Sequence, residues 1–123
     1  MPEALPNSND TIVLLHNPKC SKSRATLALL EERDAEFSVR EYLTDPLDAA
    51  ELRDLAGRLG KPIGEWLRSG EAAFAESGLS KQASAEELIA LVASQPICMQ
   101  RPILVRGNRA VIGRPPQDVL ALL

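Results

Sequence analysis

The sequence predicts an α/β fold whose single sheet mixes parallel and antiparallel strands. Three observations predict it: a strand, helix and strand pattern at the start, a helical middle, and a hairpin with a helical end. A strand, helix and strand within about thirty residues form a βαβ unit, so the two strands are parallel. The order β-α-β, helical block, β-β-α is that of a thioredoxin-like fold with four strands. The helical block, about residues 47–95, is then an insertion between the two halves.

The first half supplies a strand, a helix and a second strand. The apolar run TIVLLH (11–16) contains β-branched residues and is bounded by Asn-Pro, which favours a buried strand. From Ser21, leucines recur at helical spacing until Asp34. The next stretch, EFSVREYL, alternates and has Phe37 and Val39 on one face. It predicts the second strand.

The middle of the chain is predicted to be helical. The stretch DAAELRDLAGRLG begins with an Asp48/Glu51 pair typical of a capping box and ends at Gly60. KPIGEWLRSG has room for a short helix that ends near Gly70, and EAAFAESG is another short helical piece. SAEELIALVASQP begins with a second capping box and ends at a proline.

The last part predicts a hairpin and a final helix. The runs ILVR and RAVIG flank Gly107-Asn108, a two-residue turn typical of a β-hairpin. The end, RPPQDVLALL, has prolines where a first helical turn accepts them, followed by an apolar stripe. This pattern completes the β-β-α half.

Composition and charge limit the class of protein. The chain has 123 residues, of which 45% are hydrophobic, so we expect one domain over residues 11–123 after a flexible lead-in at residues 1–10. The apolar runs are far shorter than the ~20 residues of a membrane span. A net charge of −3 argues against nucleic-acid or acidic-membrane binding. Two widely separated cysteines match no disulfide framework or zinc pattern and favour a reducing cytoplasm.

A lone cysteine lies where the first strand turns into the first helix, in HNPKCSKSR. The N–H groups and partial positive charge of a helix N-terminus stabilise a thiolate, so the pKa of Cys20 should be lowered. Lys19, Lys22 and Arg24 act in the same direction. The alternative is that Cys20 is an ordinary small residue packed under the helix. The flanking cations favour a reactive thiol.

The same turn offers a pocket for an oxyanion and excludes two familiar mechanisms. Hydroxyls of Ser21 and Ser23 join the helix N–H groups in a pocket for a phosphate-like anion. The spacing C-x-x-S lacks the second thiol of a dithiol oxidoreductase, and the C-x5-R loop of tyrosine phosphatases is absent. Cys98 lies among apolar residues and is either a buried inert thiol or a resolving cysteine. A thiolate without a local partner needs an external thiol such as glutathione or a glutaredoxin.

Four further residues are candidates for the site. His16, the only histidine, is either a half-buried residue at the strand end or a group that holds the cysteine loop, and a metal site is not expected. Arg68 ends the predicted helix EWLR, Arg101 precedes Pro102, and Arg114 precedes two prolines. Each arginine taken singly could be a surface charge. In thioredoxin-like folds, however, the residue before the proline that opens the third strand faces the cysteine, and that proline is typically cis.

The motifs HNPKCSKSR, QRPILV and GRPP, in this order around a C-x-x-S and a helical insertion, resemble the glutaredoxin-coupled arsenate reductases of the ArsC type. The resemblance covers about residues 11–123, and the SKSR and GRPP spellings are similar to a shorter branch of that family. It implies that Cys20 is the catalytic nucleophile. The other residues that it implies are three arginines for the oxyanion, Arg68, Arg101 and Arg114, two residues that tune the cysteine, His16 and Ser23, and two that complete the loop, Asn17 and Arg24.

The resemblance also implies a mechanism and its partners. The Cys20 thiolate attacks arsenate, glutathione attacks the adduct, arsenic is reduced, and glutaredoxin removes the glutathione as arsenite leaves. No bound cofactor is expected, and glutathione is a co-substrate. One alternative is a glutathione-linked thiol oxidoreductase with another acceptor. The other is a regulatory module that binds a protein, as Spx-type regulators do; the missing C-x-x-C switch and the three arginines argue against it.

Overall fold

The computed structural model describes Leu5 and residues 11–123, so the lead-in predicted for residues 1–10 lies, apart from Leu5, outside the described residues. The chain divides into two compact units. The first, here named the sheet unit, contains the described residues up to Asp45 together with Arg101–Leu123. The second, the helical unit, is Pro46–Gln100. The helical block predicted from the sequence is the main part of this second unit.

The sheet unit is built on four strands in the order β2-β1-β3-β4. The central pair, β1 (Ile12–His16) and β3 (Ile103–Arg106), is antiparallel. Strand β2 (Ser38–Glu41) is parallel to β1, and β4 (Arg109–Ile112) is antiparallel to β3. This confirms the predicted mixed sheet and the thioredoxin-like order of its strands.

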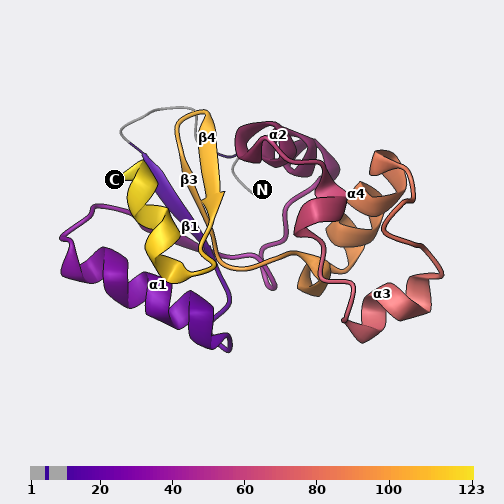
Figure 1. Ribbon diagram of the computed structural model, residues 1–123, viewed down its shortest axis with the longest axis horizontal. Helices are drawn as coiled ribbons and strands as arrows, with labels where there is room; N and C mark the ends of the chain where they lie inside the picture. The colour runs from indigo at the N-terminus through magenta and orange to yellow at the C-terminus, as the bar shows by residue number, and fades with distance from the viewer. Residues whose placement is uncertain (1–4, 6–10) are drawn as a thin grey trace. The chain divides into compact units, whose positions relative to one another are not determined.

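Two helices pack together against this sheet, α1 (Ser21–Glu32) and the 3-10 helix η3 (Pro116–Leu122) (Figure 1). The apolar core beneath them removes hydrocarbon from water, at about 25 cal/mol for each Å² buried. Helix α1 starts directly after the cysteine, because Arg24 N–H donates to Cys20 C=O at 3.0 Å and forms the first helical hydrogen bond. The core cluster comprises Ile12, Leu14, Leu30, Leu104, Val119 and Leu122.

The hairpin between β3 and β4 turns at Gly107-Asn108, as predicted. Gly107 has a φ of 59°, a conformation that glycine adopts without the steric cost of a Cβ. The turn fixes the register Val105↔Ala110, which in turn sets where β4 ends. The loop that follows β4 carries Arg114.

The helical unit contains three α-helices, α2 (Ala49–Leu59), α3 (Ala72–Ser77) and α4 (Ala85–Ser94), and two 3-10 helices, η1 (Ile63–Trp66) and η2 (Pro96–Cys98). Both predicted capping boxes are present: Asp48 with Glu51 begins α2, and Ser84 with Glu87 begins α4. No helix in the described part of the chain is long and apolar enough to cross a membrane.

Two local predictions were wrong. Helix η1 ends at Trp66 rather than near Gly70, because Leu67 turns extended and pairs antiparallel with Met99. The final helix has 3-10 hydrogen bonds such as Asp118 N–H to Pro115 C=O at 3.0 Å, since a short segment of this kind is easily tightened. The predicted second strand is present as β2, and its Val39 is 44% exposed on this edge strand.

Candidate functional site

The cysteine lies in a tight turn between β1 and α1. Cys20 N–H donates to Asn17 C=O at 3.0 Å, and Lys19 N–H donates to Asn17 Oδ1 at 3.0 Å. Asn17 itself is buried, so its side chain holds the turn from inside. Cys20 is the N-cap of α1, with extended backbone, and is 8% exposed. The turn therefore presents the thiol at the helix N-terminus, as the sequence predicts.

The surroundings of Cys20 favour its thiolate. The side chain makes no capping hydrogen bond of standard geometry. Burial raises the pKa of the thiol, but the backbone N–H groups of Ser23 and Lys22 and the Arg101 guanidinium outweigh it, and the pKa of Cys20 lies below its usual value. A lowered pKa increases the fraction of the nucleophilic form at neutral pH. Dipolar groups of helix α1 and the charge of Arg101 thus act on one sulfur.

Ser23 joins the histidine to the cysteine turn. His16 Nδ1 and Ser23 Oγ are 2.6 Å apart, and Asn17 N–H donates to the same oxygen at 3.0 Å. All three residues are buried, and Ser23 is 0% exposed. The hydroxyl therefore fixes the imidazole of His16 relative to the turn. Of the two interpretations of His16 that the sequence allows, this geometry agrees with the one in which it holds the cysteine loop.

The pKa of His16 is lowered. Burial is the main cause, Glu41 opposes it, and Arg24 adds to it. Glu41 is the register partner of His16 across the parallel pair of β1 and β2. The imidazole is consequently mostly neutral at pH 7. Depending on its tautomer, His16 Nδ1 either donates a hydrogen bond to the Ser23 hydroxyl or accepts one from it.

The rest of the motif lies on the outside of the turn. Arg24 Nη1 donates to Pro18 C=O at 2.9 Å, which ties the start of α1 to the loop before it. The side chain of Ser21 is exposed, as are Lys19 and Lys22. The exposed cations give a locally positive surface around the thiol.

Two of the three predicted arginines lie in the sheet unit with the cysteine. The Arg101-Pro102 peptide bond is cis, as the topology predicts, and so is Arg114-Pro115. Arg114 Nε donates to Arg101 C=O at 2.8 Å, and Gly113 N–H donates to Pro102 C=O at 2.9 Å. The loops that carry the two arginines are thus joined by hydrogen bonds. Arg101 reaches the thiol, and Arg114 is exposed.

Arg68 belongs to the helical unit, and its place at the site stays a prediction. It follows the extended Leu67, and its N–H donates to Cys98 C=O at 2.6 Å. Arg68 Nε pairs with Glu71 Oε1 at 3.2 Å. The side chain is partly exposed, so its guanidinium is accessible to an anion.

Cys98 is 0% exposed. Burial, followed by the charge of Glu71, raises the pKa of its thiol, the opposite of the effect at Cys20. A buried thiol with a raised pKa is a poor nucleophile. This environment agrees with the interpretation of Cys98 as an inert thiol.

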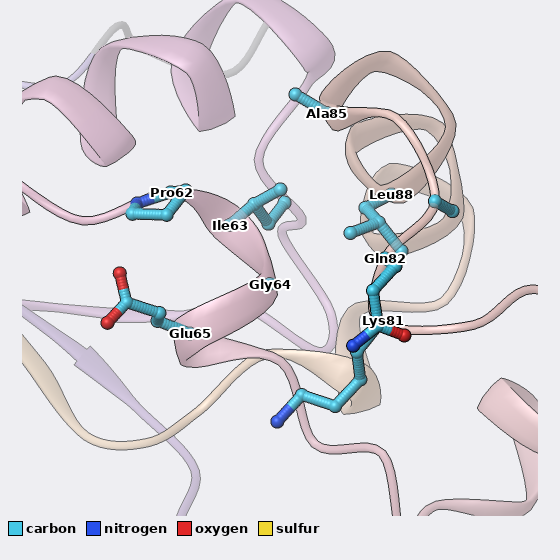
Figure 2. A pocket seen from close by; sticks show the side chains of 9 residues that line it. Pro62, Ile63, Gly64, Glu65, Lys81, Gln82, Ala85 and Leu88 are labelled. Atoms are coloured by element: carbon cyan, nitrogen blue, oxygen red, sulfur yellow. The ribbon is translucent and has the colours of Figure 1, made fainter.

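A cavity of about 400 Å³ lies within the helical unit, between η1 and the start of α4 (Figure 2). Its apolar part comes from Ile63 and Leu88, and Glu65 and Lys81 carry opposite charges at its edge. None of the residues predicted for the site lines it. In the described part of the chain, no three His, Cys, Asp or Glu side chains gather as they would around a metal ion.

Gly113 and Thr26 were not among the residues predicted for the site. Gly113 lies between the last strand and Arg114, and the fully buried Thr26 lies one turn into α1. A Cβ built on Gly113 would lie 3.0 Å from Thr26 Oγ1, so the two residues are neighbours although they are far apart in the chain, and no local pattern signals this. A glycine directly before the arginine of GRPP was the one available hint.

Comparison with known proteins shows the family of the chain. The model of the ArsC family matches residues 15–122, nearly the whole described chain. The chain belongs to the ArsC family. An arsenate reductase of Neisseria meningitidis is 37% identical to this ArsC protein over 114 residues, which cover 91% of the chain and 97% of the relative. The uncharacterized protein YfgD of Escherichia coli K12 is 44% identical, covering 91% and 96%.

The fold is also that of solved ArsC structures. An arsenate reductase from Vibrio cholerae superimposes with a TM-score of 0.87 at 40% identity, and the match covers 92% of this chain and 98% of that one. The thioredoxin-like fold predicted from the order of the elements is therefore confirmed. The relatives are matched over almost their full length, so the whole ArsC domain is compared.

Proposed function

We propose that this ArsC protein is an arsenate reductase in which the Cys20 thiolate is the nucleophile and glutathione with glutaredoxin supplies the electrons. The observation that carries the proposal is the position of Cys20 at the N-terminus of α1, with its pKa lowered by backbone N–H groups and by Arg101. The proteins of N. meningitidis and V. cholerae that are named arsenate reductases support the choice of substrate.

The first step brings two anions together. A thiolate and an arsenate repel each other at short range unless cationic groups neutralise the growing charge. Arg101 is beside the sulfur, and Arg114 is held on its main chain. Both guanidinium groups can bind oxyanion oxygens through a planar fork. We assign them, together with Arg68, to arsenate binding and to stabilisation of the adduct.

The second step requires an external thiol. Reduction of As(V) to As(III) takes two electrons, which two thiols supply when they leave as a disulfide. Cys20 has no second cysteine in its turn, and Cys98 is buried with a raised pKa. Glutathione is therefore proposed as co-substrate, with glutaredoxin removing it as a mixed disulfide. A cycle of this kind needs a reducing compartment, in agreement with the predicted cytoplasmic location.

The test is arsenate-dependent NADPH oxidation in an assay coupled through glutathione, glutaredoxin and glutathione reductase. Wild type should turn over arsenate, and Cys20→Ser should not. Cys98→Ser makes the same atomic exchange at the buried thiol and should retain turnover, provided that circular dichroism shows it folded.

The assay also separates the alternatives. If wild type gives no turnover while Cys20 still reacts fast with iodoacetamide, arsenate is the wrong acceptor. Another electrophile of a glutathione-linked oxidoreductase, or a protein-binding role, would then explain the reactive thiol better. Turnover that persists in Cys20→Ser would overturn the assignment of the nucleophile.

A further inference from the structure

Gly113 lies where three segments of the sheet unit meet. A Cβ placed on it would lie 2.9 Å from Pro102 Cγ, 3.0 Å from Thr26 Oγ1 and 3.2 Å from Val119 Cγ1. Contacts this short force a neighbour to move. Thr26 and Val119 are both 0% exposed, so neither can relieve the contact by turning into solvent. Helix α1, the loop of Pro102 and helix η3 therefore pack around a position that only a hydrogen atom fills.

Both loop residues of this contact, Pro102 and Gly113, are next to arginines of the site. Pro102 directly follows Arg101, and Gly113 directly precedes Arg114. Gly113 N–H donates to Pro102 C=O at 2.9 Å, and Arg114 Nε donates to Arg101 C=O at 2.8 Å. A shift of Pro102 away from α1 would carry Arg101 with it.

The helix residue of this contact, Thr26, is connected to the surroundings of the thiol through Lys22. Thr26 Oγ1 donates to Lys22 C=O at 2.9 Å, one turn closer to the start of α1. The N–H of Lys22 is one of the groups that favour the Cys20 thiolate. Gly113 is thus packed between the helix that bears the nucleophile and the loop that bears its guanidinium partner.

We propose that Gly113 is a positioning residue whose missing side chain sets how closely the Arg101 loop packs on helix α1, and hence how closely Arg101 approaches the Cys20 sulfur. The consequence for arsenate turnover rests on the proposed function. The consequence for the reactivity of Cys20 does not, because alkylation requires no arsenate.

The primary test is the pH profile of Cys20 alkylation in Gly113→Ala. Iodoacetamide labelling is followed by mass spectrometry of the Cys20 peptide, which separates it from Cys98. The profile should move to higher pH, and below its midpoint the rate should fall roughly threefold, because the added methyl moves Arg101 away from the thiolate. Gly57→Ala is the matched control, since a Cβ there meets nothing within 4 Å. It should leave the profile unchanged.

Repeating the Gly113→Ala substitution in the Arg101→Gln variant distinguishes positioning of Arg101 from a general loss of structure. In Arg101→Gln the guanidinium is already absent, so adding Gly113→Ala should cause no further shift in the profile. An equal shift in both backgrounds would overturn the proposal, because Gly113 would then act independently of Arg101. An unshifted profile in the folded single variant would overturn it as well.

A milder pair tests the same contact if Gly113→Ala does not fold at the assay temperature. Thr26→Val replaces the hydroxyl that faces Gly113 with a bulkier methyl, whereas Thr26→Ser keeps the hydroxyl and its bond to Lys22. The proposal expects slower alkylation of Cys20 in Thr26→Val than in Thr26→Ser. Equal rates would contradict it. If wild type shows no arsenate turnover, the proposed function fails, and these labelling results still decide the role of Gly113.

Discussion

At the scale of single residues, the proposed function gives Arg101 two separable roles: its charge acts on the thiol, and its planar fork binds the oxyanion. Arg101→Lys keeps the charge and loses the fork. We expect arsenate kcat/KM to fall roughly 10²-fold, the typical loss when one oxyanion donor is removed. The alkylation profile of Cys20 should change less in this variant than in Arg101→Gln. Retention of wild-type turnover in Arg101→Lys would remove Arg101 from the oxyanion site.

The Ser23 hydroxyl satisfies two buried groups, Asn17 N–H and His16 Nδ1. Ser23→Ala leaves both without this partner, and an unsatisfied buried polar group costs about 1–3 kcal/mol. We expect the free energy of unfolding in urea to fall by about that amount. Ser21→Ala, the same change on the exposed side of the turn, should have little effect on stability. Equal effects of the two substitutions would contradict the structural role of the buried hydroxyl.

The lowered pKa of His16 predicts how stability depends on pH. The value in the unfolded chain is near 6.5, and burial, more than the charge of Arg24, holds the folded value below it against the pull of Glu41. As pH falls below about 6.5, the unfolded chain binds a proton before the folded one, so folding stability decreases down to the folded pKa. Urea midpoints between about pH 7.5 and 5.5 should therefore fall more in wild type than in His16→Gln. Parallel curves would show that His16 titrates normally.

At the scale of the elements, two glycines of α2 and its C-cap can be compared. Replacing each by alanine should change the stability of the protein in opposite directions. Gly57 lies inside α2, exposed, where a Cβ would meet nothing, so Gly57→Ala should stabilise the protein by about 0.5–1 kcal/mol through helix propensity. Gly60 is the C-cap with a φ of 68°, so Gly60→Ala should destabilise it by about 1 kcal/mol. Urea unfolding measures both. The same sign for the two substitutions would contradict the assigned end of α2.

The elements also show which local sequence patterns are sufficient to predict structure. Both capping boxes and the two-residue hairpin turn were predicted because their hydrogen bonds join residues within one turn of chain. The extended segment after Trp66 was missed because it pairs with Met99, which no local pattern reveals. Alternation in the second strand predicts which residues share a face but not whether anything covers that face, and Val39 is 44% exposed.

In the candidate site, too, local parts could be predicted from the sequence and parts that depend on packing could not. The turn from His16 to Arg24 could be predicted because one contiguous motif contains the strand end, the cysteine and the start of the helix. Topology alone placed Arg101, through the proline that opens β3. The contact of Gly113 with Thr26 could not be predicted, since it depends on how α1, η3 and the Pro102 loop pack together.

At the scale of the whole molecule, the predicted single domain over residues 11–123 can be tested by unfolding. The helical unit is inserted in the sheet unit and is joined to it at both of its ends, at Asp45-Pro46 and at Gln100-Arg101. An insertion held at both ends loses less chain entropy on folding when its host is already folded. We therefore expect the two units to unfold together.

One probe in each unit makes this prediction measurable. The only tryptophan, Trp66, is fully buried in the helical unit, so its fluorescence follows that unit. In the sheet unit, amide hydrogen exchange of β1 and β3 follows the central strands. A single domain requires the same free energy of opening from both probes, and a coincident urea transition by circular dichroism. If Trp66 becomes exposed at lower urea than the central strands exchange, the helical unit folds as a separate cooperative unit and the single-domain prediction is wrong.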